Sequence, residues 1–257
     1  MAKSAPLGNQ AALLILFCVA SAWTPCTLAD QIKPKFGPNA VPIQQATDYL
    51  RRHRAPDYWA LSPFYRPQST GSDCSVVSIA MLLNAIRGVP RHAEVEIITP
   101  EGVLAAVDNR RWKSETAEQG MGVTFSELTE AVKLSLRKYG LKNYQVDVFK
   151  PLDASHSNLL KLQEILTRNE LSDRHIALVY FNQGVLTGDW NGPHISPVGA
   201  YDAGRGRVLI MDVDRRFYVP YWSPVTKLLE SMLKPAPRRF EGLSGETGGI
   251  VWVQPAP

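Results

Sequence analysis

The chain has 257 residues, of which 45% are hydrophobic and 20% are charged, and its formal net charge is +4. This composition is ordinary for a globular protein, and the length fits one large domain or two small ones. Because the basic residues form no block and no basic–aromatic stripe, the sequence argues against nucleic acid as a partner.

Residues 1–29 have the pattern of a secretory signal. Lys3 supplies the positive start, and the apolar run over residues 11–22 is too short to span a membrane. We expect cleavage near Ala29 and export to the periplasm, with an uncleaved N-terminal membrane anchor as the alternative. Residues 30–43, which contain three prolines, are expected to form a linker.

Cleavage at that point would leave a single thiol. Cys18 and Cys26 lie within the predicted signal, so Cys74 would be the only cysteine of the mature chain and would have no partner for an internal disulfide. An unpaired cysteine in an exported protein is a candidate reactive thiol, although a buried cysteine usually acts as a small hydrophobic residue.

The segment around Cys74 predicts a thiol at the start of a buried helix. A turn-forming loop, QSTGSD over residues 68–73, precedes Cys74, and the apolar run SVVSIAMLLN over residues 75–84 follows it. The helix macrodipole and the free N–H groups at that end favour an anion, and therefore a thiolate. Gln68 can fold back over the loop and offer its amide N–H₂ to an oxyanion.

The other segments are assigned from periodicity, capping residues and turn residues. We expect helices over residues 43–54, from Pro100 with Thr99 as N-cap, over 124–139 opened by a capping box, over 158–168 and over 225–233 capped by Ser223; strands over residues 144–149, 175–181 and 248–254; and loops over residues 56–67, 109–123 and 182–193.

A β-hairpin over residues 194–213 contains the next candidate groups. The segment HISPVGAY, a glycine-rich turn and the segment RVLIMDV predict strand, turn and strand. If the turn is centred near Ala203, His194 lies directly opposite Asp212, about 5 Å away at Cβ, and the aspartate can fix the imidazole tautomer. A shift of one residue would put the two side chains on opposite faces of the hairpin.

Cys74, His194 and Asp212 can therefore form a nucleophile, a base and an orienting acid. Each has a bland alternative, since a lone histidine at a strand start is usually structural and an aspartate that ends a strand is often a turn residue. The other histidines lack such a partner and show no metal-ligand spacing, so we expect no built-in metal cofactor.

The order of the elements, with helices first and strands later, predicts an α+β fold of the papain-like type. In such a fold, the buried central helix that carries Cys74 would pack on an antiparallel sheet. We expect a single domain over residues 44–257, because the sequence shows neither an internal repeat nor a second domain boundary.

These stretches resemble the catalytic domain of phytochelatin synthases, the glutathione γ-glutamylcysteinyltransferases, in their short bacterial form. That family carries a glutamine six residues before its cysteine, as Gln68 is here. It also carries segments similar to PHISPVGAY over residues 193–201 and MDVDR over residues 211–215, the latter followed by Tyr218. Asp73 stands where the family has an aromatic residue, and the Asp-Cys pair resembles that of bacteriocin-processing cysteine peptidases instead.

The resemblance implies acyl transfer on glutathione. Cys74 would attack the carbonyl that joins γ-Glu-Cys to glycine, Gln68 would stabilise the oxyanion, and His194 would protonate the leaving amine. The thioester would then pass to water or to a second glutathione, which would be phytochelatin synthesis and would serve metal detoxification. Arg215 would hold a substrate carboxylate, with Tyr218 also in the substrate site, unless Arg215 is simply a surface arginine. Cadmium or zinc would enter as a thiolate complex of the substrate.

Two other functions stay open at this point. One is a papain-like peptidase that acts on ordinary peptides, and the other is a non-catalytic periplasmic binding protein in which the site is vestigial. The sequence also leaves open the choice between hydrolysis and transfer, and the choice between a monomer and a homodimer.

Overall fold

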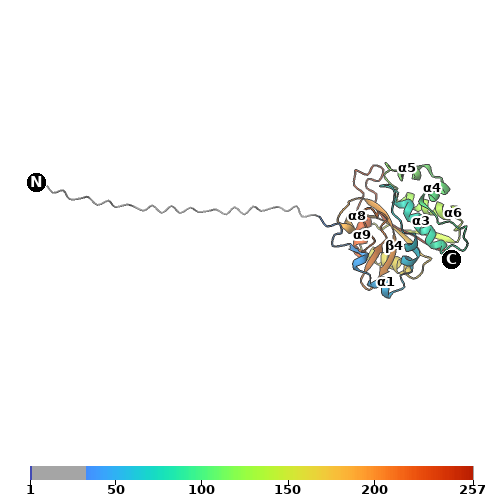
Figure 1. The fold of residues 1–257 in the computed structure, drawn as a ribbon, viewed down its shortest axis with the longest axis horizontal. Coiled ribbons are helices and arrows are strands. Elements are labelled where there is room, and N and C mark those ends of the chain that lie inside the picture. The colour runs from blue at the N-terminus through green and yellow to red at the C-terminus, as the bar shows by residue number, and fades with distance from the viewer. Residues whose placement is uncertain (2–32, 257) are drawn as a thin grey trace. The chain divides into compact units, whose positions relative to one another are not determined.

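The computed structural model describes Met1 and residues 33–256 (Figure 1). The chain divides into a unit over residues 1–33 and a compact unit over residues 34–257, and the second contains all the helices and strands named below. Apart from Met1, the predicted signal lies outside the described residues, and so do Cys18 and Cys26. Among the described helices, none has the length and hydropathy needed to cross a bilayer.

The described chain builds an antiparallel sheet whose spatial order is β1-β6-β5-β4-β3-β7-β2. The last strand in the sequence thus lies inside the sheet, between β3 and β2, which ties the end of the domain to its centre. The strands are β1 Val41–Pro42, β2 Tyr144–Phe149, β3 Ile176–Asn182, β4 Pro193–Asp202, β5 Arg207–Ile210, β6 Tyr221–Pro224 and β7 Gly249–Pro255.

Helices cover both faces of this sheet, so the predicted α+β class is confirmed. Helices α3, α4 and α6 pack together on one face, and α7, α8 and α9 pack on the other, with β4 between the two groups (Figure 1). The helices are α1 Asp48–Arg52, α2 Pro56–Leu61, α3 Cys74–Arg87, α4 Pro100–Val107, α5 Arg110–Glu115, α6 Phe125–Lys138, α7 His156–Asn169, α8 Gln183–Thr187 and α9 Val225–Leu233.

The central strand β3 divides the interior into two hydrophobic cores. Its even-numbered residues, such as Leu178, belong to the core beneath α3, and its odd-numbered residues, such as Val179, belong to the core beneath α9. Side chains alternate across a strand, so a strand buried on both faces needs apolar residues at every position. This requirement explains the uninterrupted apolar run that predicted β3.

The buried helix expected after Cys74 is present as α3. Every residue from Cys74 to Ile86 is buried, and the helix ends at Gly88, whose φ of 70° suits a residue without a side chain. Local capping explains the other well-predicted helices too. Thr99 accepts a hydrogen bond from Gly102 N at the start of α4, and a complete capping box opens α6.

Several short elements differ from the prediction. Helices α2, α5 and α8 lie where loops were expected, because each begins with a local signal too short to stand out: Pro56 as the first helical residue, or the Asn109 or Asn182 side chain as a cap. Ser223 does not cap α9, since it belongs to β6 and its hydroxyl has no partner among the described residues.

The segment expected to be a linker is packed against the domain from residue 34 onward. Gly37 N donates to Thr187 O at 2.6 Å, Ala40 is buried, and Val41 and Pro42 pair with β6. Phe36 also contacts the rings of two buried tyrosines edge-on. This segment therefore contributes to the wall of the domain and brings its side chains close to α8.

A half-buried carboxyl group, that of Glu170 at the C-terminal end of α7, gives the fold a pH dependence. Glu170 accepts hydrogen bonds from Tyr49 Oη at 3.0 Å and from Tyr201 N at 2.7 Å. Burial is the largest cause that raises the pKa of Glu170 to about 7, well above its value in an unfolded chain. The group therefore contributes stability that is fully present below pH ~4.5 and is lost as the pH rises through about 7.

We expect Glu170→Gln to flatten this dependence, because glutamine keeps an acceptor for Tyr201 N and does not ionise. Between pH 5 and pH 8 the wild type should lose roughly 1–2 kcal/mol more stability than the variant, after allowance for the partial exposure of the group. Urea unfolding at both pH values measures the difference. Glu164→Gln is the matched control, since Glu164 lies on the exposed side of α7, and parallel curves for wild type and Glu170→Gln would contradict the assignment.

Candidate active site

The loop before Cys74 is held in place by the carboxylate of Asp73. That carboxylate accepts hydrogen bonds from Ser69 N at 3.0 Å, Ser69 Oγ at 2.6 Å and Thr70 N at 3.1 Å. The Asp73 backbone carbonyl meanwhile accepts from Val76 N at 2.9 Å, at the start of α3. Asp73 thus closes the turn and leads the chain into the helix, which gives a structural reason for an acidic residue beside Cys74.

Cys74 is the first residue of α3 and is 8% exposed. It carries a free thiol, and it lines a cavity of about 400 Å³. The next residue, Ser75, points away into the interior, where its Oγ accepts a hydrogen bond from Trp112 Nε1 at 3.0 Å. The polar residues on both sides of Cys74 therefore have partners of their own.

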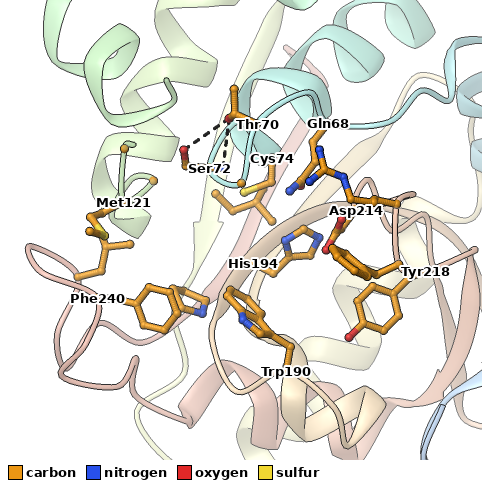
Figure 2. Close-up of a pocket in the computed structure, with 18 of the residues that line it drawn as sticks. Gln68, Thr70, Ser72, Cys74, Met121, Trp190, His194, Asp214, Tyr218 and Phe240 are labelled. Carbon is orange, nitrogen blue, oxygen red and sulfur yellow. Dashed lines mark hydrogen bonds between the residues drawn. The ribbon is translucent and has the colours of Figure 1, made fainter. Parts of the chain in front are cut away.

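Gln68 lies beside Cys74 and lines the same cavity (Figure 2). Its backbone N–H donates to Val213 O at 2.8 Å, which ties the loop before Cys74 to the segment just after Asp212. The side-chain Oε1 of Gln68 is buried and has no hydrogen-bond partner among the described residues. The hydrogen bond of its backbone N–H therefore holds Gln68 next to the thiol, and the side-chain carbonyl oxygen takes no part in this.

The hairpin that carries His194 does not have the predicted register. The turn is centred between Gly204 and Arg205, not near Ala203, because Asp202 pairs with Arg207. His194 instead lies opposite Phe181 of β3. Asp212 lies beyond the end of β5, so the predicted direct pairing is wrong.

A β-bulge nevertheless returns the two side chains to one face. The register shifts by one residue between Val198 and Ala200, around Gly199. Near the turn, the observed pairing register differs from the predicted one by an odd number of residues. The bulge changes this difference by one residue and so makes it even, and a register difference of an even number of residues keeps side chains on the same face. A Cβ on Gly199 would lie 2.7 Å from Met211 Cγ, so the close approach at the bulge suits glycine.

His194 and Asp212 are hydrogen-bonded and almost fully buried. The distance from His194 Nε2 to Asp212 Oδ1 is 2.9 Å. With Nε2 engaged, Nδ1 is the remaining ring nitrogen, and Figure 2 shows the imidazole next to the Cys74 side chain. Burial alone would lower the pKa of His194, but the charge and hydrogen bond of Asp212, followed by those of Cys74, hold that pKa well above its ordinary value.

Three further groups hold the carboxylate of Asp212. Gln183 Nε2 donates to Oδ2 at 2.6 Å, Tyr221 Oη donates to Oδ2 at 3.0 Å, and the backbone N of Asp214 donates to Oδ1 at 2.9 Å. Burial alone would raise the pKa of Asp212, but the charge and hydrogen bond of His194, and then the amide of Gln183, keep that pKa below its ordinary value. Asp212 is therefore a fixed, ionised carboxylate.

The cavity has a charged end and an apolar end, with the thiol and the imidazole between them. In Figure 2, Asp214 and Tyr218 lie on one side of His194, and Met121 and Phe240 lie on the other. The charged residues that line the cavity are Lys35, Asp189, Asp214 and Arg216. The exposed apolar residues along its opening are Met121, Trp190 and Phe217.

The structure brings five of the six predicted site residues together and separates the sixth from them. Gln68, Cys74 and His194 line the cavity and Asp212 lies behind His194. Tyr218 also lines the cavity and donates to Asp189 Oδ2 at 2.9 Å. Arg215 is not among the described residues that line it: its guanidinium lies over the ring of Tyr65, 4.6 Å from the centroid.

Arg216, the next residue, does line the cavity, and sequence reasoning gave it no role. Gln183 and Tyr221 were also missed. Gln183 lay in an expected loop, 29 residues before the carboxylate that it contacts. Tyr221 lies nine residues after Asp212, and its contact with that carboxylate was not predicted. Lys35 was missed because its segment was expected to be a linker.

Among the described residues, no group of three histidine, cysteine, aspartate or glutamate side chains is placed to hold a metal ion. The fold and the site together define a mixed α+β domain whose cavity presents a free thiol beside a buried, carboxylate-bound imidazole.

The family follows from comparison with known proteins. The family model described as phytochelatin synthase matches residues 43–238, which is most of the chain, and the chain belongs to that family.

The similar curated proteins are plant enzymes. Glutathione gamma-glutamylcysteinyltransferase 1 of Lotus japonicus is 26% identical over 211 residues, which cover 76% of this chain and 35% of that protein. Glutathione gamma-glutamylcysteinyltransferase 1 of Arabidopsis thaliana is 24% identical over 192 residues, which cover 71% of this chain and 35% of that protein. The matched region thus spans about a third of the length of these relatives.

Proposed function

We propose that this protein is a cysteine-dependent glutathione γ-glutamylcysteinyltransferase with a papain-like fold, in which α3 is the central helix that carries the nucleophile. The observation that carries the proposal is the set of Cys74, His194 and Asp212, assembled in a cavity around a 2.9 Å hydrogen bond from the imidazole to a buried carboxylate. The family and the names of its relatives support glutathione as the substrate.

In the first step, the Cys74 thiolate attacks the carbonyl carbon that joins γ-Glu-Cys to glycine. The Gln68 amide and the Cys74 backbone N–H stabilise the oxyanion. The carbon–nitrogen bond then breaks, and the His194 imidazolium gives its proton to the departing glycine amine. The products of this step are free glycine and a γ-Glu-Cys thioester on Cys74.

In the second step, neutral His194 takes a proton from the attacking group. If water attacks, the carbon–sulfur bond breaks and γ-Glu-Cys leaves. If the amine of a second glutathione attacks, the product is a phytochelatin, which binds metal through its thiols. Cadmium or zinc enters in this scheme as a thiolate complex of the substrate, outside the protein's own ligand set.

The charged end of the cavity favours a γ-glutamyl group over an ordinary peptide. A γ-linked glutamate keeps its α-amino and α-carboxylate groups free, so it is a zwitterion, whereas an internal α-linked residue has neither group. Lys35 and Arg216 can meet the carboxylate, and Asp189 and Asp214 can meet the ammonium. Burial, ahead of all other causes, raises the pKa of Asp214, and nearby Lys35 and Arg216 oppose that shift.

We expect Lys35→Gln to raise the KM for glutathione by about 3- to 10-fold with little change in kcat, because Lys35 acts on ground-state binding at a distance from the thiol. The substitution also leaves Asp189, now 2.6 Å from the ammonium, without that cation, so it would repel a substrate carboxylate. Steady-state glycine release measures both constants. Lys150→Gln, which removes a lysine paired with Glu246 outside the cavity lining, is the control, and an unchanged KM for Lys35→Gln would remove Lys35 from the substrate site.

The proposed function is tested by incubating the purified protein with glutathione, with and without cadmium or zinc, and analysing the products by mass spectrometry. Free glycine with γ-Glu-Cys would identify a glutathione hydrolase. Peptides of the form (γ-Glu-Cys)ₙ-Gly would identify phytochelatin synthesis. If no glycine is released while Cys74 still reacts with a thiol probe, a peptidase acting on ordinary peptides becomes the better assignment. Export to the periplasm and the oligomeric state are separate proposals, tested by fractionation of cells and by light scattering.

A further inference from the structure

The cavity contains a buried hydroxyl group that the proposed mechanism does not use. Tyr180, on β3, is 2% exposed and lines the cavity together with Cys74. Its hydroxyl is buried and has no hydrogen-bond partner among the described residues. A buried polar group without a partner is unfavourable and rare in native proteins, so each case calls for an explanation.

The position of Tyr180 in the sheet directs its ring toward the thiol side of the molecule. Tyr180 pairs with Ile195, the residue after His194, and its side chain belongs to the core beneath α3. The ring also contacts Phe125 edge-on, with 6.2 Å between centroids, so packing holds the hydroxyl in one place. The unpartnered group is therefore fixed in the wall of the cavity.

The groups around this hydroxyl make it a hydrogen-bond donor. Burial is the largest cause that raises the pKa of Tyr180 above its ordinary range, and the charges of Glu246, Cys74 and Glu127 raise it further. The phenol therefore stays neutral and keeps its proton at any pH at which the protein would work. Because Cys74 and Tyr180 both line the cavity, a group carried on the thiol lies in the same space as the phenol.

We infer that the Tyr180 hydroxyl donates a hydrogen bond to an oxygen atom of the acyl group that Cys74 carries, and so helps to hold that group during acylation and release. This inference rests on the proposed function, in which the acyl group is γ-Glu-Cys. Among the residues that the structure describes, the hydroxyl lacks a partner because its partner belongs to the substrate. Such an arrangement lowers the stability of the free protein somewhat, and it stabilises the state in which Cys74 carries the acyl group.

Replacing Tyr180 by phenylalanine separates this role from a structural one. The variant loses only the hydroxyl oxygen, so its thermal stability should equal or exceed that of the wild type, since an unsatisfied group has been removed. The kcat/KM for glycine release from glutathione should fall by about 10- to 100-fold. Alkylation of Cys74 by iodoacetamide without substrate should proceed at the wild-type rate, since the hydroxyl does not act on the thiol.

Ser135→Ala is the matched control. The Ser135 hydroxyl is also buried without a partner among the described residues, but it lies on α6 and does not line the cavity. This variant should keep or gain stability and retain wild-type glycine release. A drop in activity for Tyr180→Phe but not for Ser135→Ala would thus identify a substrate contact.

Each contrary result overturns the inference in a recognisable way. Equal kcat/KM for Tyr180→Phe and wild type would mean that the hydroxyl contacts no substrate atom. A loss of thermal stability would mean that the hydroxyl has a structural partner, and a changed alkylation rate would mean that it acts on the thiol. If the wild type itself releases no glycine, the proposed function fails and the inference fails with it, which distinguishes that outcome from the others.

Discussion

Replacing Cys74 by alanine should abolish glycine release from glutathione, with a loss of about 10⁴-fold or more. Without the sulfur atom, no thioester can form, and the remaining groups can only orient substrate and water. Folding should survive, because Cys74 is small, lies at the first position of α3 and makes no disulfide. The measurement is glycine by mass spectrometry, together with a thermal melt of the same sample.

Two companion variants make this result specific to the thiol. Cys74→Ser keeps the shape of the side chain but supplies a hydroxyl that stays protonated near neutral pH, so it should be as inactive as alanine. Ser75→Ala alters the next buried position and removes the acceptor for Trp112 Nε1. It should cost about 1–2 kcal/mol of stability but leave most of the activity. Turnover by Cys74→Ala near the wild-type rate would exclude the proposed mechanism.

The parts of the fold that were predicted well are those with local signals. The capping box at Thr124 is complete within four residues, and Gly88 ends α3 at the position where the apolar run stops. The side chains of β3 alternate between two cores, and this pattern also depends only on consecutive residues. Such features need no knowledge of the rest of the chain, because their energies come from neighbouring backbone groups.

The site could be predicted only as far as its residues have partners nearby in the sequence. His194 and Asp212 are joined by one hairpin, so even a wrong turn centre left them as candidates. The bulge at Gly199, which determines their final approach, has no signal beyond a glycine within a strand.

Other parts of the site depend on contacts between distant segments. Lys35 reaches Asp189 across 154 residues, and no spacing rule connects the two. The role of Gln183 could not be predicted for a related reason. The helix that positions it, α8, has only five residues and lies in a segment rich in turn-forming residues. A buried hydroxyl that lacks a partner among the described residues, such as that of Tyr180, can be recognised only when the tertiary structure is known. The same holds for the charges that surround such a group.

Replacing Asp212 by asparagine should lower kcat/KM by about 10²- to 10⁴-fold and move the alkaline limb of its pH profile to lower pH. In the wild type, the charge of Asp212 raises the pKa of His194 against the opposing effect of burial. Asparagine keeps an acceptor oxygen at nearly the same place but carries no charge. Burial then dominates, the imidazolium loses its proton at lower pH, and the acid for the leaving amine is lost earlier.

The same substitution changes how stability depends on pH. Because the folded-state pKa of His194 is raised, its contribution is fully present below pH ~6.5 and is lost as the pH rises through the folded value. The contribution of Asp212, whose folded-state pKa is lowered, is present above pH ~3.8 and is lost as the pH falls through the folded value. Asp212→Asn should remove the alkaline loss, because the pKa of His194 is no longer raised. On the acid side, the loss should pass from Asp212 to His194: burial now lowers the folded-state pKa of the imidazole, so stability falls as the pH drops from ~6.5 through that value.

Tyr221→Phe provides the comparison that isolates charge from hydrogen bonding. It removes one donor to Asp212 Oδ2 but keeps the carboxylate, which still accepts from Gln183 and His194. Its alkaline limb should therefore stay close to that of the wild type, with a modest loss of kcat. The imidazole proton signals of His194, followed by NMR through the titration, report its pKa directly. An unmoved alkaline limb in Asp212→Asn would show that the aspartate holds the ring in place without setting its charge.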